Sequence, residues 1–157
     1  YVSGRAGVKG SGASGVCATG LATLRRDGFA SMDSDGPAGT LTTRLVTFRG
    51  KYLFVNADAR AGELRVEVLD KEGRVIQPFT RSQCTPIRAD KTLQPVKWGR
   101  RGDLSAVAGQ AVRFRFHLRG GRLYSFWVSP ERSGASHGYV AAGGPGFSGP
   151  ADTISGK

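Results

Sequence analysis

Apolar and polar residues alternate along most of the chain between residues 40 and 129. In GELRVEVLD, residues 62–70, leucine and valine alternate with glutamate and arginine, and a period of two puts these two sets on opposite faces of a β-strand. Comparable runs, separated by short turns, lie at 40–50, 51–59, 74–79, 93–99 and 111–129. No stretch of ten or more residues shows helical periodicity. The pattern therefore predicts an all-β protein.

Short strands joined by short turns are typical of a two-sheet antiparallel β-sandwich of the jelly-roll type. We expect residues 1–20 to be a Gly/Ser-rich tether, 21–129 to form the sandwich, and the Gly/Pro-rich tail, 130–157, to pack on it. Residues 21–32 look like a strand interrupted by a turn at Asp27-Gly28, and residues 103–109 like one helical turn.

The most regular alternation surrounds Gly120-Gly121, in AVRFRFHLRGGRLYSFWVS. Two strands separated by a Gly-Gly pair predict a β-hairpin with a two-residue turn, because glycine takes the positive φ that such turns need. In that register Arg119 opposes Arg122, and opposed residues share a face of the sheet. The predicted core face consists of Val112, Phe114, Phe116, Leu118, Leu123 and Trp127, and the predicted outer face of Arg113, Arg115, His117, Tyr124 and Phe126.

This outer face suggests a ligand site. Aromatic rings stack on the apolar faces of sugar rings, and Tyr124 and Phe126 are the predicted platform. Arg113, Arg115 and His117 are the predicted polar rim, which would also bind a uronate or a sulfate. The alternative is that this face is solvated or lies beneath another segment, with arginine stems covering the aromatic rings.

The chain carries 23 Lys and Arg against 12 Asp and Glu, a formal net charge of +11. Such a charge attracts polyanions, and Arg, which outnumbers Lys, forks onto carboxylates, sulfates and phosphates alike. No apolar run is long enough for a membrane-spanning helix, so we expect no membrane partner. The two cysteines, Cys17 and Cys84, could form a disulfide or remain two buried thiols, and the sequence leaves both open.

Catalytic and metal-binding signals are weak. The 12 acidic residues fall mainly in turns and suggest no pair of catalytic carboxylates, and His117 and His137 occur in no metal or nucleophile motif. GSGASG, residues 10–15, follows no strand and precedes no helix, which argues against a dinucleotide site. DSDG, residues 33–36, resembles part of a calcium loop but lacks the closing glutamate, so no cofactor is expected and structural calcium is the single metal considered.

The order LRRDGFASM, LTTRLVTFRGKYLFVNADA, GELRVEVLDKEG, DLSAVAG and VRFRFHLRGGRLYSFWVS resembles a known module. It is similar to the C-terminal β-sandwich that follows a five-bladed β-propeller in bacterial glycoside-hydrolase-like proteins with the architecture of glycosidase family 32. The resemblance spans roughly residues 21–129. It implies an accessory or carbohydrate-binding domain, with RRDGFAS as the exit from the propeller and the catalytic carboxylates upstream of this chain.

The resulting expectation is a non-catalytic module of a secreted or periplasmic bacterial glycosidase-like protein that binds polysaccharide or oligosaccharide, with a preference for acidic polymers. Its other partner would be a catalytic domain upstream of the present chain. One alternative is a structural domain that braces such a partner without a ligand. The other is a basic nucleic-acid-binding module, for which the chain lacks an RNP-like pattern or zinc spacing.

Overall fold

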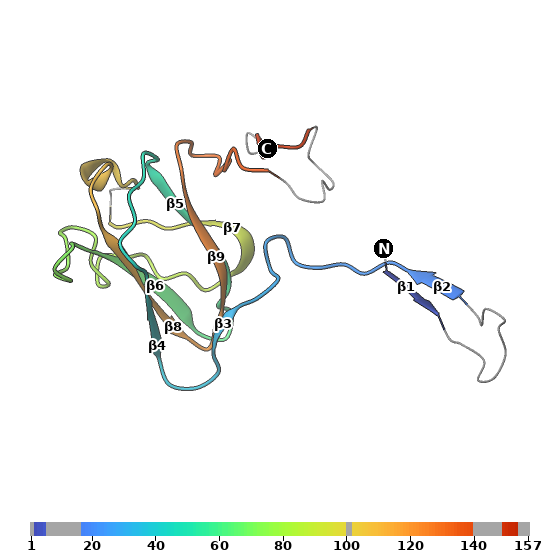
Figure 1. Cartoon of the computed structure of the whole chain (residues 1–157). Coiled ribbons are helices and arrows are strands. Elements are labelled where there is room, and N and C mark those ends of the chain that lie inside the picture. The colour runs from blue at the N-terminus through green and yellow to red at the C-terminus, as the bar shows by residue number, and fades with distance from the viewer. Residues whose placement is uncertain (1, 6–16, 100–101, 140–148, 154–157) are drawn as a thin grey trace.

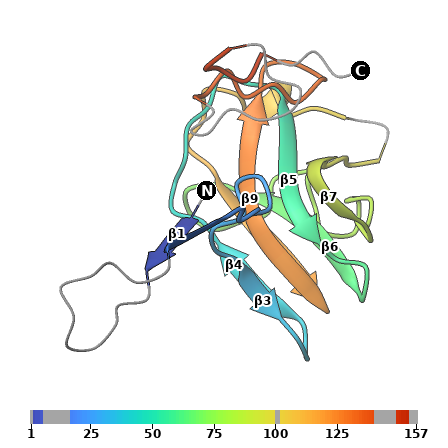
Figure 2. The same ribbon diagram turned by 90° about the vertical axis from the view of Figure 1, so that its right-hand side faces the viewer.

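The computed structural model describes residues 2–5, 17–99, 102–139 and 149–153. Two antiparallel sheets face each other and enclose the core (Figures 1 and 2). One sheet has the order β3-β9-β5-β7 and the other β4-β8-β6. The prediction of an all-β, two-sheet antiparallel sandwich is confirmed, and the described residues contain no α-helix. The strands of the sandwich are β3 (Met32–Ser34), β4 (Gly39–Thr42), β5 (Tyr52–Asp58), β6 (Glu63–Leu69), β7 (Asp90–Pro95), β8 (Arg113–Arg119) and β9 (Gly121–Ser129).

A separate hairpin of β1 (Val2–Arg5) and β2 (Cys17–Gly20) extends away from the sandwich (Figure 1). The ends of the predicted tether thus pair as strands, while GSGASG lies outside the described residues. Residues 21–31 are not the predicted strand but an extended segment with a turn at Arg26-Asp27, which we call the strap. The predicted helical turn is a 3₁₀ helix, Ser105–Val107, and Gly109 follows it with φ of 79°.

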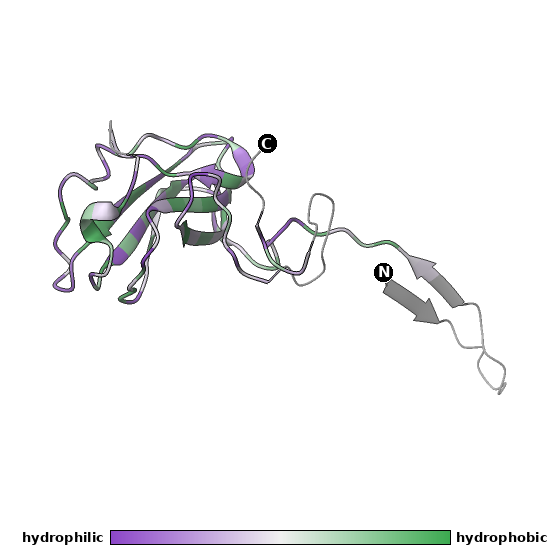
Figure 3. Cartoon of the chain, turned by 90° about the horizontal axis from the view of Figure 1, so that it is seen from above, coloured by the Kyte–Doolittle hydropathy of each residue, from purple (hydrophilic) through white to green (hydrophobic). Residues whose placement is uncertain are grey.

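Alternating side chains of both sheets fill the core, and bands of hydrophobic and hydrophilic residues along the strands are visible in Figure 3. The Phe126 ring of β9 lies 4.9 Å from the Phe116 ring and 5.9 Å from the Phe114 ring of β8. Trp98, which follows β7, is 1% exposed and donates its indole N–H to Val66 O at 2.8 Å. Burial of these large rings stabilises the sandwich, and the one polar atom among them, the indole nitrogen of Trp98, is paired.

The predicted hairpin around Gly120-Gly121 is wrong. β8 and β9 do not pair, because β8 lies between β4 and β6 in one sheet and β9 between β3 and β5 in the other. The chain therefore crosses between the sheets at these glycines. Gly120 has φ of 57°, and a Cβ on Gly121 would overlap Asp58 O. A tight crossing between sheets and a hairpin turn both need backbone conformations, such as positive φ, that residues other than glycine adopt at an energetic cost. A Gly-Gly pair is therefore compatible with either.

A β-bulge in β9 reverses the alternation that the sequence suggests. Leu123 opposes Ala57 of β5 and Ser125 opposes Asn56, so Tyr124 is the extra residue between them. Beyond the bulge Phe126 points into the core, and Trp127 lies on the outer face, stacked on Phe54 with ring centres 5.6 Å apart. The predicted faces of Phe126 and Trp127 are therefore exchanged, because one inserted residue shifts every later side chain to the other face.

The outer edge of β6 is covered by the segment that follows it. Val68 N donates to Phe79 O at 2.9 Å, Val66 N to Cys84 Sγ at 3.2 Å, and Leu64 N to Ile87 O at 2.9 Å. These bonds satisfy donors that an uncovered edge would expose. They also hold residues 75–87 beside the outer face of the sheet β4-β8-β6, where the candidate site lies.

We predict that Gly121→Ala destabilises the protein by about 1–3 kcal/mol, because the added methyl must displace the backbone of β5 at the crossing. Gly36→Ala is the matched control, since a Cβ there meets nothing within 4 Å, and its effect should stay within about 0.5 kcal/mol. Urea unfolding of both variants measures the difference, and equal midpoints would contradict the close crossing.

Candidate functional site

Three of the five predicted ligand residues do share a face. Arg113, Arg115 and His117 alternate with core residues along β8 and project from the outer face of the sheet β4-β8-β6. Glu67 of β6, 7% exposed, joins two of them: its Oε1 lies 3.2 Å from Arg115 Nη1 and 3.0 Å from His117 Nε2. Arg113 instead donates to Thr43 O at 3.3 Å. Arg115 and His117 are thus held in fixed positions beside a buried carboxylate, whereas a backbone carbonyl holds Arg113.

Tyr124 and Phe126 do not belong to this face, so the prediction that all five residues lie together is wrong. Phe126 is in the core between the sheets. Tyr124 lies at the bulge of the opposite sheet, and the Arg25 guanidinium covers its ring at 4.6 Å from the ring centre. Neither ring is therefore a platform beside the β8 residues, because Phe126 lies in the core and Tyr124 belongs to the other sheet.

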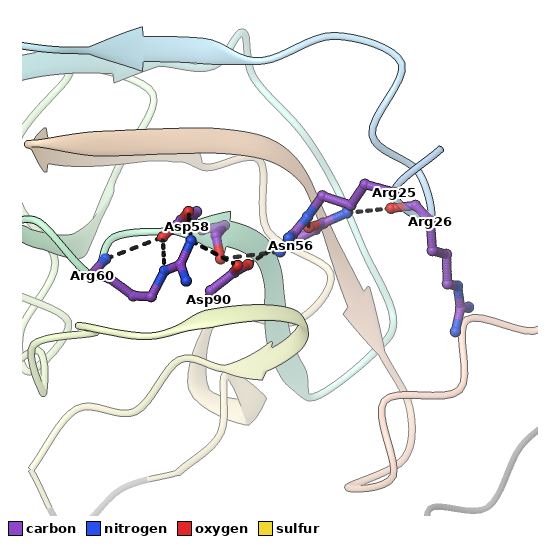
Figure 4. Close-up of polar contacts among 7 residues, drawn as sticks. Arg25, Arg26, Asn56, Asp58, Arg60 and Asp90 are labelled. Atoms are coloured by element: carbon purple, nitrogen blue, oxygen red, sulfur yellow. Dashed lines mark hydrogen bonds and ion pairs between the residues drawn. The ribbon is translucent and has the colours of Figure 1, made fainter. Parts of the chain in front are cut away.

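The strap occupies the outer face of the sheet β3-β9-β5-β7 (Figure 4). Asn56, 1% exposed, accepts a hydrogen bond from Arg25 Nε at 2.5 Å and donates one to Arg26 O at 2.5 Å. Arg25 also reaches Asp90 Oδ1 at 2.5 Å and Ala57 O at 3.2 Å. Arg26 binds Asp152 at 2.8 Å, which ties the strap to the C-terminal tail. This network is structural, since each partner is a group of the chain itself.

A polar groove runs over β6 and β8 on the other sheet. It consists of two adjoining hollows of about 270 and 550 Å³ that share Glu63, Arg65 and Arg81. His117 and Arg119 line the first hollow, and Glu67 lines the second. No Phe, Tyr or Trp is among the described residues that line it. We call these two hollows the β6–β8 groove.

Ion pairs fix the floor of the β6–β8 groove. Arg65 binds Glu63 Oε1 at 3.2 Å and Cys84 O at 2.9 Å, and Arg88 binds Glu63 Oε2 at 2.9 Å. The hydrogen bond from Arg88 and then that from Arg65 outweigh burial and lower the pKa of Glu63. Glu63 is therefore ionised at neutral pH, with its side chain 18% exposed.

Two arginines at the groove have no such partner. Arg81 and Arg119 are exposed, and neither side chain meets a carboxylate among the described residues. Both line the hollow that His117 and Arg65 also line. A guanidinium with free donors beside a preorganised polar floor can bind a carboxylate, sulfate or phosphate group in a bidentate manner.

Sequence analysis found part of this groove. The alternation in GELRVEVLD already placed Glu63, Arg65 and Glu67 on one face, but nothing in it indicated that they lie beside His117. Arg81 was missed, because it comes from the irregular segment between Pro78 and Pro86, whose position depends on its bonds to β6.

The other candidate chemistry does not form a site. No group of three or more His, Cys, Asp or Glu residues that could hold a metal occurs in the described ranges. In the DSDG segment, Asp33 pairs with Arg122 at 3.4 Å. His137 lies 2.8 Å from Glu131. Cys84 is a free, buried thiol, and burial raises its pKa, while the side chain of Cys17 lies outside the described part of the structure.

Comparisons with protein families, curated proteins and solved structures find no match to this chain. A helix long and apolar enough to cross a membrane is absent from the part of the chain that the structure describes.

We predict that Glu63→Gln lowers the free energy of unfolding at pH 7 by about 0.5–1 kcal/mol, because two arginine pairs are lost. The folded-state pKa of Glu63 is lowered, so this contribution is present above the unfolded-state pKa of about 4.3 and is lost as the pH falls further. Urea unfolding from pH 7 to pH 3 should show the two proteins converging in acid. Arg88→Gln should give a smaller pH dependence, and a constant difference at all pH values would contradict the pairing.

Asn56→Ala should release the strap. Trypsin is expected to cleave after Arg25 and Arg26 at least tenfold faster in the variant, because local opening that costs about 1.4 kcal/mol less is tenfold more populated. Gln94→Ala, on the neighbouring strand, is the control, since the Gln94 side chain bonds only Pro95 O. Equal cleavage rates in two folded variants would show that Asn56 does not hold the strap.

Proposed function

We propose that this sandwich is a non-catalytic module that binds acidic polysaccharide in the β6–β8 groove. The observation that carries the proposal is the pair of unpartnered arginines, Arg81 and Arg119, beside the fixed set of His117, Glu67 and Arg65. Uronate or sulfate groups would accept hydrogen bonds from the two guanidinium groups. Sugar hydroxyls, which both donate and accept, suit a floor where carboxylates and cations alternate.

The lining of the groove favours a saccharide over single-stranded nucleic acid. Proteins that bind single strands stack bases on aromatic rings, and the described lining residues include no Phe, Tyr or Trp, while the His117 ring is held by Glu67. The resemblance of residues 21–129 to the accessory sandwich of glycoside-hydrolase-like proteins supports the same choice. It also supports a secreted bacterial protein with its hydrolytic domain upstream.

The electrostatics of the groove favour binding rather than hydrolysis. A glycosidase needs a general acid whose pKa is raised, so that it is protonated near neutral pH. The Glu63 pKa is instead lowered by Arg88 and Arg65, and Glu67 contacts Arg115 and His117. The ionised Glu63 carboxylate accepts hydrogen bonds but donates no proton.

A second candidate function, bracing a neighbouring domain, is favoured by the strap. Arg25 and Arg26 anchor it to the sandwich, while Leu24 and Phe29 on the same segment are 59% and 87% exposed. Apolar side chains presented by an anchored segment are typical of an interface between domains. In this alternative the β6–β8 groove binds no glycan.

Titration calorimetry with an oligogalacturonate, a sulfated oligosaccharide, a neutral cello-oligosaccharide and an oligothymidylate tests the proposal. We expect the acidic saccharides to bind more tightly than the neutral one. Arg81→Ala and Arg119→Ala should each weaken that binding about tenfold, since a hydrogen bond to a charged group contributes about 1.5–3 kcal/mol.

Arg49→Ala is the matched control, because it removes an exposed arginine that lines neither hollow. The double variant Arg81→Ala/Arg119→Ala binding as tightly as the wild type would overturn the site. Preferential binding of oligothymidylate would support the nucleic-acid alternative, and the absence of binding to every ligand would leave the bracing function.

A further inference from the structure

A second groove lies on the outer face of the opposite sheet. It has a volume of about 450 Å³ and opens where β5 begins and β7 ends. Tyr52 and Phe54 come from β5, Pro95 from β7, and Arg132 from the loop after β9. Lys97 and Asp103 complete the polar part of its wall. We call it the Tyr52 groove.

The side chains of the Tyr52 groove are held in place by the fold. Arg132 Nε donates to Tyr52 Oη at 3.2 Å, and its guanidinium carbon lies 5.8 Å from the centre of the Tyr52 ring. Asp103 accepts a hydrogen bond from Ser105 N at 3.0 Å, and the neighbouring Leu104 N donates to Lys51 O at 2.6 Å. The hydrogen bonds from Ser105 lower the pKa of Asp103, so a carboxylate stands in the groove at neutral pH.

The chemistry of this groove differs from that of the β6–β8 groove. Tyr52 and Pro95 give this groove an aromatic ring and a proline ring, whereas the apolar lining of the β6–β8 groove consists of aliphatic side chains such as Leu118 and Val75. Lys97 is exposed and meets no carboxylate among the described residues, while Asp103 can accept hydrogen bonds from hydroxyl groups. A hollow lined by an aromatic ring, a cation and a carboxylate fits a sugar ring that bears both hydroxyl groups and an acidic substituent.

We propose that the Tyr52 groove is a second saccharide site, so that one sandwich binds two chains of an acidic polysaccharide on its two outer faces. This inference rests on the proposed function of the β6–β8 groove. The two sites lie on different sheets, and facing sheets are about 10 Å apart, so one short oligosaccharide does not reach both. A module with two outward-facing sites links separate polymer chains, and the linkage gains affinity through multivalency.

The stoichiometry of oligogalacturonate binding to the whole chain tests this inference. The wild type should bind two oligosaccharides, and Tyr52→Ala/Lys97→Ala should bind one. Arg81→Ala/Arg119→Ala should also bind one, and the four substitutions combined should bind none. Tyr52→Phe keeps the ring and removes the bond to Arg132, so it should retain two sites if Tyr52→Ala acts by removing the ring.

Polygalacturonate supplies a second measurement. The wild type should crosslink the polymer and raise its turbidity, whereas either double variant, having one site, should not. Thermal unfolding of each variant controls for loss of the fold.

One site in the wild type that Arg81→Ala/Arg119→Ala abolishes would overturn the second site and leave the proposed function standing. One site that only Tyr52→Ala/Lys97→Ala abolishes would overturn the proposed β6–β8 site and the bivalent module with it. No binding at all would overturn both.

Discussion

The crossing at Gly120-Gly121 is the constraint on which the arrangement of this sandwich depends. Because β8 and β9 enter different sheets there, their aromatic residues meet across the core instead of along one surface. The same crossing separates the outer faces of the two strands. A basic face on β8 and an aromatic face on β9 thus belong to opposite sides of the molecule, and each side has its own groove.

The two outer faces are used differently. On the sheet β3-β9-β5-β7, the strap covers the middle of the face, and the buried amide of Asn56 satisfies both its donor and its acceptor on this segment. On the sheet β4-β8-β6, the segment 75–87 covers the edge of β6 and leaves a hollow above the strands. The two faces therefore differ. The strap pairs the polar groups of the sheet β3-β9-β5-β7, whereas charged side chains on the sheet β4-β8-β6 remain exposed at a groove.

Net charge alone says little about where a ligand binds. Arg25, Arg60, Arg65 and Arg74 are paired with carboxylates of the same chain, and the Arg60 hydrogen bond lowers the pKa of Asp58 to about 2. Paired arginines stabilise local geometry and contribute little to the attraction of a polyanion at short range. In the proposed function, the arginines that bind the ligand are those that meet no carboxylate in the described part of the chain and lie beside a fixed surface, as Arg81 and Arg119 do.

The sequence by itself determined the all-β class, the alternation of β6 and β8, and the burial of Phe114 and Phe116, because a period of two is a local property of the strand. It determined that Arg113, Arg115 and His117 share a face for the same reason. Which strands pair was decided only by the tertiary structure, since Gly-Gly permits both a turn and a crossing between sheets. The bulge at Tyr124 and the position of Arg81 were decided there too, because each depends on contacts with residues distant in the chain.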